Sequence, residues 1–445
     1  MIKITIGPQL VVEGLSASDV AFTKETLTLV NPMWHKLKAM GKPVWGVPDK
    51  FRFYADNEHS LYIPRGMRQR FETWLTKMGR EYQIVDTTVA KKISEPLVSQ
   101  LKMRLYQEPI VTEAVAAREG LIVMGTGTGK TIVSLEAIYR LGLTATILVP
   151  NNLLLSQFQE EARKMFHYEV GIVNGFDKRI KDITVATYQT LTFNPHLLAS
   201  LVENTSILVV DEAQSAITDI REDILKKFRP RHLYGLSATP MREDGKTKAI
   251  NFYFGNTVAE YHETVCTPTI ETLRSGADIS VCEEYHLMVE DMVKNESRNR
   301  LIAGMVLQES LAGRKVLVLT KRIEHYQLIR TLLPNDPLFH FIDSSDPNRA
   351  AVLHALKTGL GEFSAIFGTV SLLAVGTDIP RLDTLILACD MKGEVLTTQA
   401  AGRILRLFEG KPTPKIIDIF DNKHPVFSRQ YWARFRVYKA KGWVT

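Results

Sequence analysis

The sequence predicts an α/β protein in which two parallel-sheet domains follow a small α+β domain. Short apolar runs alternate with amphipathic helical stretches from Gly120 to about Asp211, and the alternation returns from Lys315 to Phe420. Because parallel strands need a crossover connection, usually a helix, this pattern is typical of a parallel sheet. Met1–Asp86 lacks the pattern and is rich in β-branched and aromatic residues with Pro-Gly punctuation, which favours a small mixed domain.

The apolar runs place the individual strands. In the first sheet we expect strands at Leu121–Met124, Ala145–Val149, Ile183–Thr187 and Ile207–Val210. In the second we expect Lys315–Thr320, His340–Ile342, Ala365–Gly368, Thr384–Ala388 and Lys415–Phe420, with helices at Ile323–Leu333 and Asn348–Lys357. The stretches Asp86–Glu95 and Val258–Asp278 are the predicted boundaries. The expected domains are therefore 1–90, 91–265 and 266–445.

Length and composition limit the class of protein. A chain of 445 residues with 45% apolar content is long enough for two or three packed domains. It contains no apolar stretch near the ~18–20 residues that cross a bilayer, and its start lacks the apolar core of a signal peptide. We therefore expect no membrane partner and a cytoplasmic location. Cys266, Cys282 and Cys389 have no paired spacing and no neighbouring histidine cluster, which predicts buried thiols rather than disulfides or a zinc site.

Positive charge is concentrated near the N-terminus. The whole chain carries 55 Lys and Arg against 49 Asp and Glu, a balance that is compatible with a polyanionic partner but common among other proteins. The local excess consists of Lys36, Lys38, Lys42, Lys50, Arg52, Arg65, Arg68, Arg70, Lys77 and Arg80. Trp34, Trp45 and Trp74 lie among these cations, and Trp432 and Trp443 lie in the C-terminal tail. We expect most of these tryptophans to pack in the core. The alternative is that the cations contact backbone phosphates and the aromatic rings stack on an unstacked base at a DNA fork.

A glycine-rich segment joins one predicted strand to a helix. Met124-Gly125-Thr126-Gly127-Thr128-Gly129-Lys130-Thr131 follows Leu121-Ile122-Val123 and leads into the amphipathic stretch Ile132–Arg140. Glycines let consecutive backbone N–H groups turn toward phosphate oxygens, while a lysine and a hydroxyl supply a cation and a Mg²⁺ ligand. Met124 stands where the strict pattern has glycine, and an ordinary strand-to-helix turn is the alternative. The context favours a nucleoside triphosphate site formed by Gly125, Thr126, Gly127, Thr128, Gly129, Lys130 and Thr131.

Two carboxylates follow another predicted strand. Ile207-Leu208-Val209-Val210 runs directly into Asp211-Glu212-Ala213-Gln214. Ligands of open α/β sheets bind at the carboxyl ends of strands. One acid there suits Mg²⁺, which we assign to Asp211 together with Thr131, and the other, Glu212, suits polarisation of the attacking water. An isolated Asp-Glu pair would more often be a solvated helix start, but the phosphate loop favours the catalytic interpretation.

Four motifs occur in an order that resembles superfamily two helicases. They are the phosphate loop, Asp211-Glu212-Ala213-Gln214, Ser237-Ala238-Thr239-Pro240 and Gln399-Ala400-Ala401-Gly402-Arg403-Ile404-Leu405-Arg406. The resemblance covers about Leu101 to Asp421 and implies two RecA-like domains in tandem. It implies that Gln399, Arg403 and Arg406 are catalytic, with the two arginines reaching the γ-phosphate. At i and i+3 on one helical face, two guanidiniums can clamp developing phosphate charge, whereas outside this motif they would more often be surface residues.

Shorter elements resemble other parts of the same family. Arg104-Leu105-Tyr106-Gln107 is similar to the R-x-Y-Q element, which implies nucleotide contacts by Arg104 and an adenine contact by Gln107. Gly376-Thr377-Asp378-Ile379-Pro380 resembles the G-x-D-x-P segment, which implies nucleotide-linked roles for Gly376 and Asp378. Pro150, Thr187 and Thr369 lie in segments that resemble those tracking a nucleic-acid backbone, although a threonine at a strand end is more often structural. Gln214 stands where the family's Asp-Glu-Ala box usually ends in Asp or His, so no role in coupling ATP hydrolysis to nucleic-acid binding is assigned to it.

The stretch Gly235–Gly245 extends the third motif in the manner of XPB-like and UvsW-like DNA helicases. With the compact length and basic N-terminal domain, the chain is most similar to phage branch-migration helicases. This implies ATP and Mg²⁺ as cofactors, and forked or four-way DNA as partner in replication, recombination or repair. Recombination or replication proteins would be further partners, in the host cytoplasm for a phage protein.

Several alternatives stay open at this point. A double-strand DNA translocase, an RNA helicase or a restriction-complex motor would use the same motor. A non-catalytic DNA-clamping adaptor is disfavoured by the intact Lys130, Asp211, Glu212, Arg403 and Arg406. The tail Arg429–Lys441 either packs as a terminal helix or contacts DNA.

Overall fold

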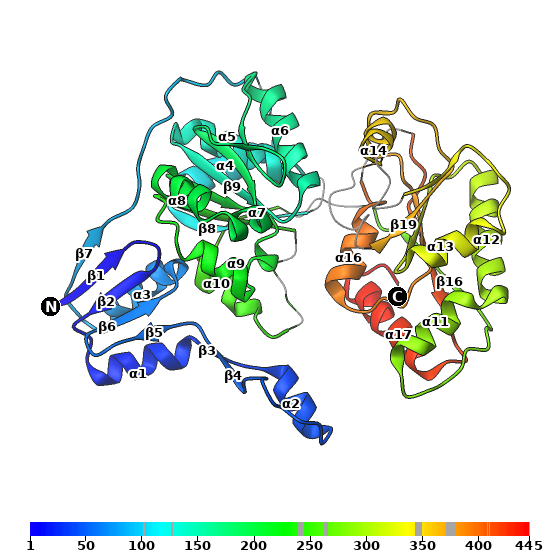
Figure 1. Ribbon diagram of the computed structural model, residues 1–445, viewed down its shortest axis with the longest axis horizontal. Coiled ribbons are helices and arrows are strands. Elements are labelled where there is room, and N and C mark those ends of the chain that lie inside the picture. Colours follow the sequence, from blue (N-terminus) through cyan, green and yellow to red (C-terminus); the bar gives the residue numbers. More distant parts are fainter. Residues whose placement is uncertain are drawn as a thin grey trace. The chain divides into compact units, whose positions relative to one another are not determined.

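A computed structural model describes residues 1–100, 103–125, 128–238, 240, 242, 244–261, 266–342, 349–370, 379–406, 408 and 410–444 (Figure 1). The chain divides into two compact units, Met1–His262 and Glu263–Thr445. Each contains a parallel sheet, and the first also carries a small mixed domain. The predicted α/β fold class is thereby confirmed.

The N-terminal part of the first unit is built on a mixed sheet. Its strand order is β5-β6-β2-β1-β7, with β1 and β7 parallel and the other neighbours antiparallel. These strands are β1 (Ile2–Ile6), β2 (Leu10–Glu13), β5 (Ala55–Asp56), β6 (Ser60–Ile63) and β7 (Tyr82–Asp86), accompanied by α1 (Ala17–Thr26), the 3-10 turn η1 (Arg65–Met67) and α3 (Arg68–Lys77). A separate antiparallel pair, β3 (Thr28–Val30) and β4 (Lys50–Arg52), carries α2 (Pro32–Ala39), none of whose residues is buried.

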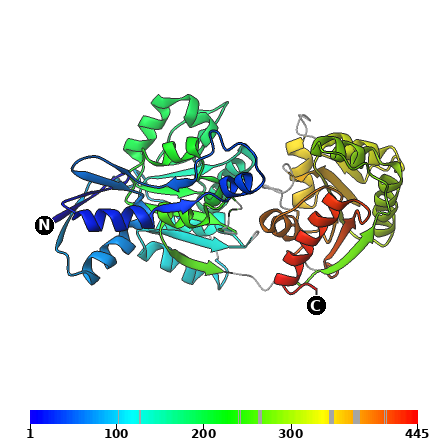
Figure 2. The ribbon, with the colours of Figure 1, turned by 90° about the horizontal axis from the view of Figure 1, so that it is seen from below.

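The larger sheet of the first unit has the order β11-β10-β12-β9-β13-β14-β8-β15, and only the β10–β11 pair is antiparallel. Its strands are β8 (Glu119–Met124), β9 (Ala145–Val149), β10 (Gly171–Val173), β11 (Lys178–Arg179), β12 (Ile183–Thr187), β13 (Ile207–Val210), β14 (His232–Ser237) and β15 (Thr257–Tyr261). The helices are α4 (Gln107–Ala116), α5 (Lys130–Leu141), α6 (Asn152–Phe166), α7 (Tyr188–Phe193), α8 (Pro195–Asn204), η2 (Ala213–Ser215), α9 (Asp219–Leu225) and α10 (Thr247–Phe254). Figure 2 shows helices on either side of this sheet.

The N-terminal sheet and the larger sheet share one hydrophobic core. Ile4 and Leu61 from the first sheet belong to the same buried cluster as Leu121 of β8 and Phe252 of α10. Phe53 links the two parts directly, since its ring lies edge-on to Phe252 with centroids 5.6 Å apart. The sequence predicts two domains here, but it does not predict that their buried apolar side chains form one cluster.

Arg65 fixes this packing with buried polar contacts. Its side chain is almost fully enclosed, and Nε donates to Glu119 Oε2 at 3.1 Å. The guanidinium also donates to the carbonyl oxygens of Pro230 and, at 3.0 Å, of Arg231. The next residue must be glycine, because a Cβ on Gly66 would lie 2.2 Å from the backbone nitrogen of Gly255.

The chain after β7 follows the surface of the larger sheet. Val89 N donates to Arg229 O at 2.8 Å, and Lys91 N donates to Ser206 Oγ at 2.6 Å. Ser94 N then donates to Asp182 Oδ2 at 2.6 Å. The segment predicted as a linker therefore has no regular secondary structure but is attached along its length.

The second unit contains an all-parallel sheet of order β16-β21-β20-β17-β19-β18. The strands are β16 (Thr269–Arg274), β17 (Val316–Thr320), β18 (Phe339–Phe341), β19 (Ala365–Thr369), β20 (Thr384–Leu387) and β21 (Lys415–Phe420). The helices are α11 (Tyr285–Lys294), α12 (Glu296–Leu311), α13 (Ile323–Arg330), α14 (Arg349–Thr358), α16 (Glu394–Gly402) and α17 (Pro425–Ala440). In β17, Leu317 and Leu319 face one core and Val316 and Val318 face another, as expected for a strand covered on both sides.

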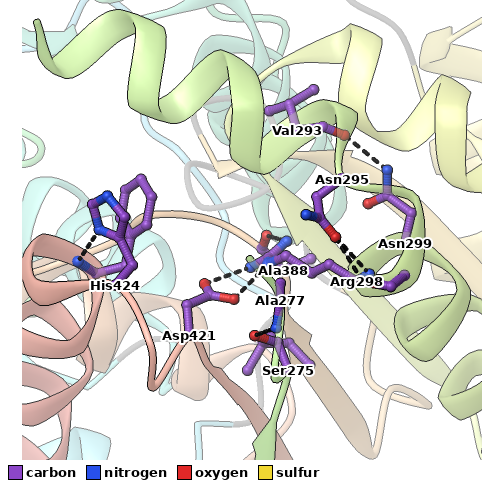
Figure 3. Close-up of polar contacts among 12 residues, drawn as sticks. Ser275, Ala277, Val293, Asn295, Arg298, Asn299, Ala388, Asp421 and His424 are labelled. Atoms are coloured by element: carbon purple, nitrogen blue, oxygen red, sulfur yellow. Dashed lines mark hydrogen bonds and ion pairs between the residues drawn. The ribbon is translucent and has the colours of Figure 1, made fainter. Parts of the chain in front are cut away.

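A buried ion pair holds α12 onto the C-terminal edge of this sheet (Figure 3). Arg298 is 1% exposed, and its guanidinium donates to Asp421 at 2.8 and 3.2 Å and to Ala388 O at 3.0 Å. Asn299 Nδ2 donates to Val293 O at 2.7 Å, so its Oδ1 is free to accept from His325 Nε2 at 3.0 Å. Burial, and then the Arg298 charge, lower the pKa of His325 to about 3.

Strand placement agrees closely with the sequence prediction, but some elements were missed. All the expected strands are present, and β18 lies one residue earlier than His340–Ile342. The strands β14, β15 and β16 were not predicted; β15 and β16 fall in the stretch Val258–Asp278. None of the described helices has the length and apolar character needed to cross a membrane.

The expectations about cysteines and tryptophans are confirmed only in part. Cys389 is buried as predicted, but Cys266 and Cys282 are exposed because they lie in the connections on either side of β16. Core packing, expected for most tryptophans, does not extend to Trp45, which is 93% exposed, or to Trp432, which is 49% exposed. The C-terminal tail is α17, which packs inward through Arg434: its Nη2 lies 2.6 Å from Asp418 Oδ1.

We predict that Arg65→Ala lowers the free energy of unfolding by about 3–5 kcal/mol, because it leaves Glu119 buried without its cation. Urea unfolding of the full chain measures this loss. Lys3→Ala is the matched control, since the Lys3–Glu13 pair is half-exposed and its removal should cost less than about 1 kcal/mol. Equal losses in the two variants would contradict the role given to Arg65.

The buried His325 predicts a pH dependence of stability. The pKa of His325 is lower in the folded protein than in the unfolded chain, because burial disfavours the charged ring. Its contribution to the free energy of unfolding is therefore complete above pH 6.5 and is lost as the pH falls toward 3, since the unfolded chain takes up the proton first. At one unit below 6.5 the expected loss is about 1.4 kcal/mol. His325→Gln should therefore lose less stability than wild type between pH 7.5 and pH 5.5 in urea unfolding. An unchanged pH dependence in the variant would exclude this role.

Candidate nucleotide site and nucleic-acid groove

The phosphate loop lies between β8 and α5, as the sequence predicts. Gly129 precedes the first residue of α5 and has φ of +92°, which favours glycine. Lys130 Nζ donates to the carbonyl oxygens of Met124 at 3.1 Å and of Gly125 at 3.3 Å. Thr128 Oγ1 donates to Gly125 O at 2.8 Å and closes the loop. Thr126 and Gly127 lie outside the described residues.

Gln107 is packed directly against this loop. It is 2% exposed, its Oε1 accepts from Arg104 N at 3.0 Å and its Nε2 donates to Thr128 O at 3.2 Å. A Cβ on Gly129 would lie 2.4 Å from Gln107 Nε2. Tyr106 OH also donates to Thr128 O at 2.9 Å. The segment proposed to recognise adenine is therefore attached to the loop proposed to bind phosphate.

The carboxylates Asp211 and Glu212 follow β13 at the same edge of the sheet. Asp211 is 5% exposed, and burial, followed by the nearby Glu212 charge, raises its pKa above its ordinary value. The Lys130 cation acts in the opposite direction on this pKa. Glu212 has φ of +52°, a strained backbone conformation for a residue with a side chain.

Gln214 links this carboxylate segment to the third motif. Its Nε2 donates to Glu212 Oε2, and its Oε1 accepts from Ser237 Oγ at 2.7 Å. Arg242, which follows the same motif, donates to the carbonyl oxygen of Gln214. A residue to which the sequence assigned no role therefore connects Glu212 with the end of β14.

The side chains proposed for Mg²⁺ have suitable chemistry. Asp211 and Thr131 offer a carboxylate and a hydroxyl oxygen, the hard ligands that Mg²⁺ prefers. Gln157 Nε2 on α6 donates to Thr131 Oγ1 at 3.1 Å, which leaves the oxygen's remaining lone pair for a cation. The donor set therefore fits the ion that the sequence predicts.

The arginines of the last motif do not share a helical face. Helix α16 contains Gln399 but ends at Gly402, and Arg403 caps it. Arg403 N donates to Ala400 O at 3.2 Å and Ile404 N to Ala401 O at 3.0 Å, so the chain tightens into a turn before Arg406. The expectation that Arg403 and Arg406 lie on one helical face at i and i+3 is therefore wrong. Gly402 has a low helix propensity, and hydrogen bonds from each N–H to the carbonyl three residues earlier close the last turn before Arg406.

Lys411 attaches the chain beyond Arg406 to the neighbouring segment. Its Nζ donates to Arg406 O at 2.7 Å and to Pro380 O at 3.2 Å. Burial lowers the pKa of Lys411 to about 8. Gly376 and Asp378 precede Pro380 but lie outside the described residues.

Two of the three predicted nucleic-acid contacts line one groove. Pro150 follows β9 and Thr187 ends β12, and both line a groove of about 450 Å³. Thr187 Oγ1 lies 2.9 Å from Thr190 Oγ1, which also lines the groove. Thr369 ends β19 in the second unit, where it occupies the corresponding carboxyl end of a parallel strand.

Comparison with known proteins agrees with the motifs. Residues 100–242 match the family described as "Type III restriction enzyme, res subunit". "Probable helicase D10" of Escherichia phage T5 is 25% identical over 380 residues, which cover 83% of this chain and 82% of that protein. "DNA 3'-5' translocase XPB2" of Sulfurisphaera tokodaii is 29% identical over 163 residues, which cover 36% of each chain.

A solved structure shares the fold. The "ATP-dependent Type ISP restriction-modification enzyme LlaBIII bound to DNA" aligns with a TM-score of 0.58 and 15% identity, over 83% of this chain and 34% of that chain. The motifs resemble those of superfamily two helicases, and relatives named as helicases are similar to this chain over most of its length. The chain is thus similar to phage and viral proteins named as helicases and, over a shorter stretch, to an XPB-type translocase.

Sequence reasoning missed several residues around these sites. The sequence around Gln157 gives no sign of its contact with Thr131. The two side chains meet because α6 packs beside α5. Tyr261 lies on the unpredicted strand β15 and stacks on Tyr106 with ring centroids 3.9 Å apart. The role of Gln214 follows from its position two residues after Glu212 and from its approach to Ser237, which sequence spacing does not reveal.

We predict that Gly129→Ala weakens ATP binding by roughly tenfold or more, since overpacking of this kind costs about 1–3 kcal/mol and here displaces Gln107. Titration with a fluorescent ATP analogue measures the effect. Gly142→Ala is the control, because Gly142 has φ of +61° but open space around it. That change should cost about 1 kcal/mol of stability and leave ATP binding intact. Equal affinities of the two variants would contradict the proposed packing.

Proposed function

We propose that the protein is an ATP-dependent DNA helicase that unwinds or branch-migrates forked and four-way DNA in replication, recombination or repair. The observation that carries the proposal is the position of the phosphate loop after β8 and of the Asp211–Glu212 pair after β13, both at the carboxyl edge of one parallel sheet. This is the arrangement that nucleoside triphosphate hydrolysis requires.

In the proposed site each side chain has one task. Lys130 and the loop N–H groups hold the phosphates, and Gln107 and Arg104 position the nucleotide base beside the loop. Thr131 and Asp211 hold Mg²⁺, which would neutralise charge on the phosphate oxygens. Glu212, oriented by Gln214, accepts a proton from the attacking water.

The second motor domain completes this proposal. Arg403 and Arg406 stabilise the charge that develops on the γ-phosphate, and Gln399 positions that segment. Gly376 and Asp378 link nucleotide state to the nucleic-acid path. ATP binding would then draw residues 91–265 and 266–445 together and hydrolysis would release them, so that alternate grips advance the strand.

Contacts to DNA are proposed in two places. Pro150, Thr187 and Thr369 bind the backbone of one strand, since hydroxyls and strand-end N–H groups suit phosphate without selecting sequence. Residues 1–90 form an accessory domain for branched DNA. Support comes from the segment around α2, which presents Lys36, Lys38 and Lys42 together with the exposed Trp45.

The proposal is tested by measuring ATP hydrolysis and strand displacement with no nucleic acid, single-stranded DNA, duplex DNA, a four-way junction and matched RNA. We expect selective stimulation and remodelling with forked or four-way DNA. Stimulation by RNA alone would favour an RNA helicase, and stimulation by duplex DNA without strand separation would favour a translocase. Failure of every substrate to stimulate hydrolysis would exclude a nucleic-acid motor.

Two variants separate binding from turnover in the same assay. Lys130→Ala should abolish hydrolysis, and full activity would remove the phosphate-loop assignment. Arg403→Ala should retain ATP binding but slow turnover by about 10³-fold or more, as for other arginines that contact the transferred phosphate. The assignment of Arg403 fails if turnover is unaltered while binding is intact.

A further inference from the structure

Two phenylalanines at the proposed DNA groove are unusually exposed. Phe176 is 96% exposed and Phe193 is 76% exposed, and both line the groove that contains Pro150 and Thr187. Neither side chain belongs to a motif recognised in the sequence. An exposed phenylalanine loses the favourable burial of its ring, so two of them beside one groove favour a binding surface.

Phe176 is held outward by a tight hairpin. It lies between β10 and β11, whose Val173 and Lys178 are paired. Asn174 Oδ1 accepts from Phe176 N at 2.8 Å and from Asp177 N at 2.8 Å, and Asn174 N donates to Asp177 O at 2.8 Å. The backbone is therefore ordered before any ligand arrives, which reduces the entropy lost when the ring is covered.

Phe193 is fixed on the other element that lines the groove. It is the last residue of α7, and the following Asn194 donates from Nδ2 to Thr190 O at 2.7 Å. Thr187 directly precedes α7, so the helix joins a proposed phosphate contact to an exposed aromatic ring. Both rings thus project from short, hydrogen-bonded segments.

The polar lining of the groove favours an anionic ligand. Lys178 contributes a cation, and Asn151, Asn152, Thr187 and Thr190 contribute amides and hydroxyls. Among the described residues that line the groove there is no Asp or Glu. A partner with phosphates and flat apolar rings matches both features, whereas duplex DNA keeps the faces of its bases stacked inside.

We propose that Phe176 and Phe193 stack on unstacked bases of a single strand whose backbone passes Pro150 and Thr187. This inference rests on the proposed function and adds to it, because it assigns single-stranded DNA to the first motor domain and names the residues that bind its bases. Every base has a π-face, so the contact is tolerant of sequence.

The experiment compares the full-length protein with its Phe176→Ala and Phe193→Ala variants. Fluorescence anisotropy measures binding to a labelled oligothymidylate and to the same oligomer with its central bases replaced by abasic sugars. Each variant should bind the intact oligomer roughly 5- to 150-fold more weakly, as expected for loss of one stacked base. Loss of the bases should weaken binding by wild type most and by each single variant less, because a single variant keeps only one stacked base to lose. Phe176→Trp should restore binding.

Leu311→Ala is the matched control, since Leu311 is 88% exposed at the end of α12 in the other unit. It should bind both oligomers as wild type does. ATP hydrolysis without nucleic acid should be unchanged in all four variants, which shows that they are folded. If wild type binds single strands but the phenylalanine variants bind equally well, the stacking inference is overturned and the motor stands. If wild type does not bind the oligothymidylate but its ATP hydrolysis is stimulated by four-way DNA, the stacking inference is overturned while the proposed function stands.

Discussion

The parallel arrangement of the strands is the constraint on which the rest of the structure depends. Since β8, β9, β12, β13 and β14 run in the same direction, the loops that follow them emerge at one edge of the sheet. Those loops carry the phosphate loop, Pro150, Thr187, the Asp211–Glu212 pair and the third motif. Burial of each strand on both faces stabilises this edge, so polar and strained segments can be accommodated there.

Strain and close contacts are concentrated at this edge. Glu212 adopts a left-handed conformation, and Gly129 leaves no room for a Cβ beside Gln107. Gln214 connects the Asp211–Glu212 segment to β14, while Gln157 connects Thr131 to α6. Amide side chains therefore join these segments by hydrogen bonds of 2.7 and 3.1 Å.

The sequence predicted the elements whose signal is local. Strongly apolar strands such as Ile207–Val210, and the glycine loop before α5, were placed correctly because composition alone marks them. The strand β14 was missed because His232 and Gly235 interrupt its apolar run. The strands β15 and β16 were missed because polar residues alternate with apolar ones in them, so neither contains a continuous apolar run. Contacts such as Gln157 with Thr131 depend on helix packing, and the end of α16 depends on one glycine inside a motif. The exposure of Phe176 depends on a hairpin that short apolar runs do not reveal.

The continuous core between the N-terminal sheet and the larger sheet has a practical consequence for dissecting the protein. Ile4, Leu61 and Phe53 contribute to a core that also contains Leu121 and Phe252. A truncated chain that starts after β7 would present this apolar surface to water and leave Glu119 without its cation. Residues 1–90 therefore do not form an independently packed module, and moving them to another protein would require moving α10 with them.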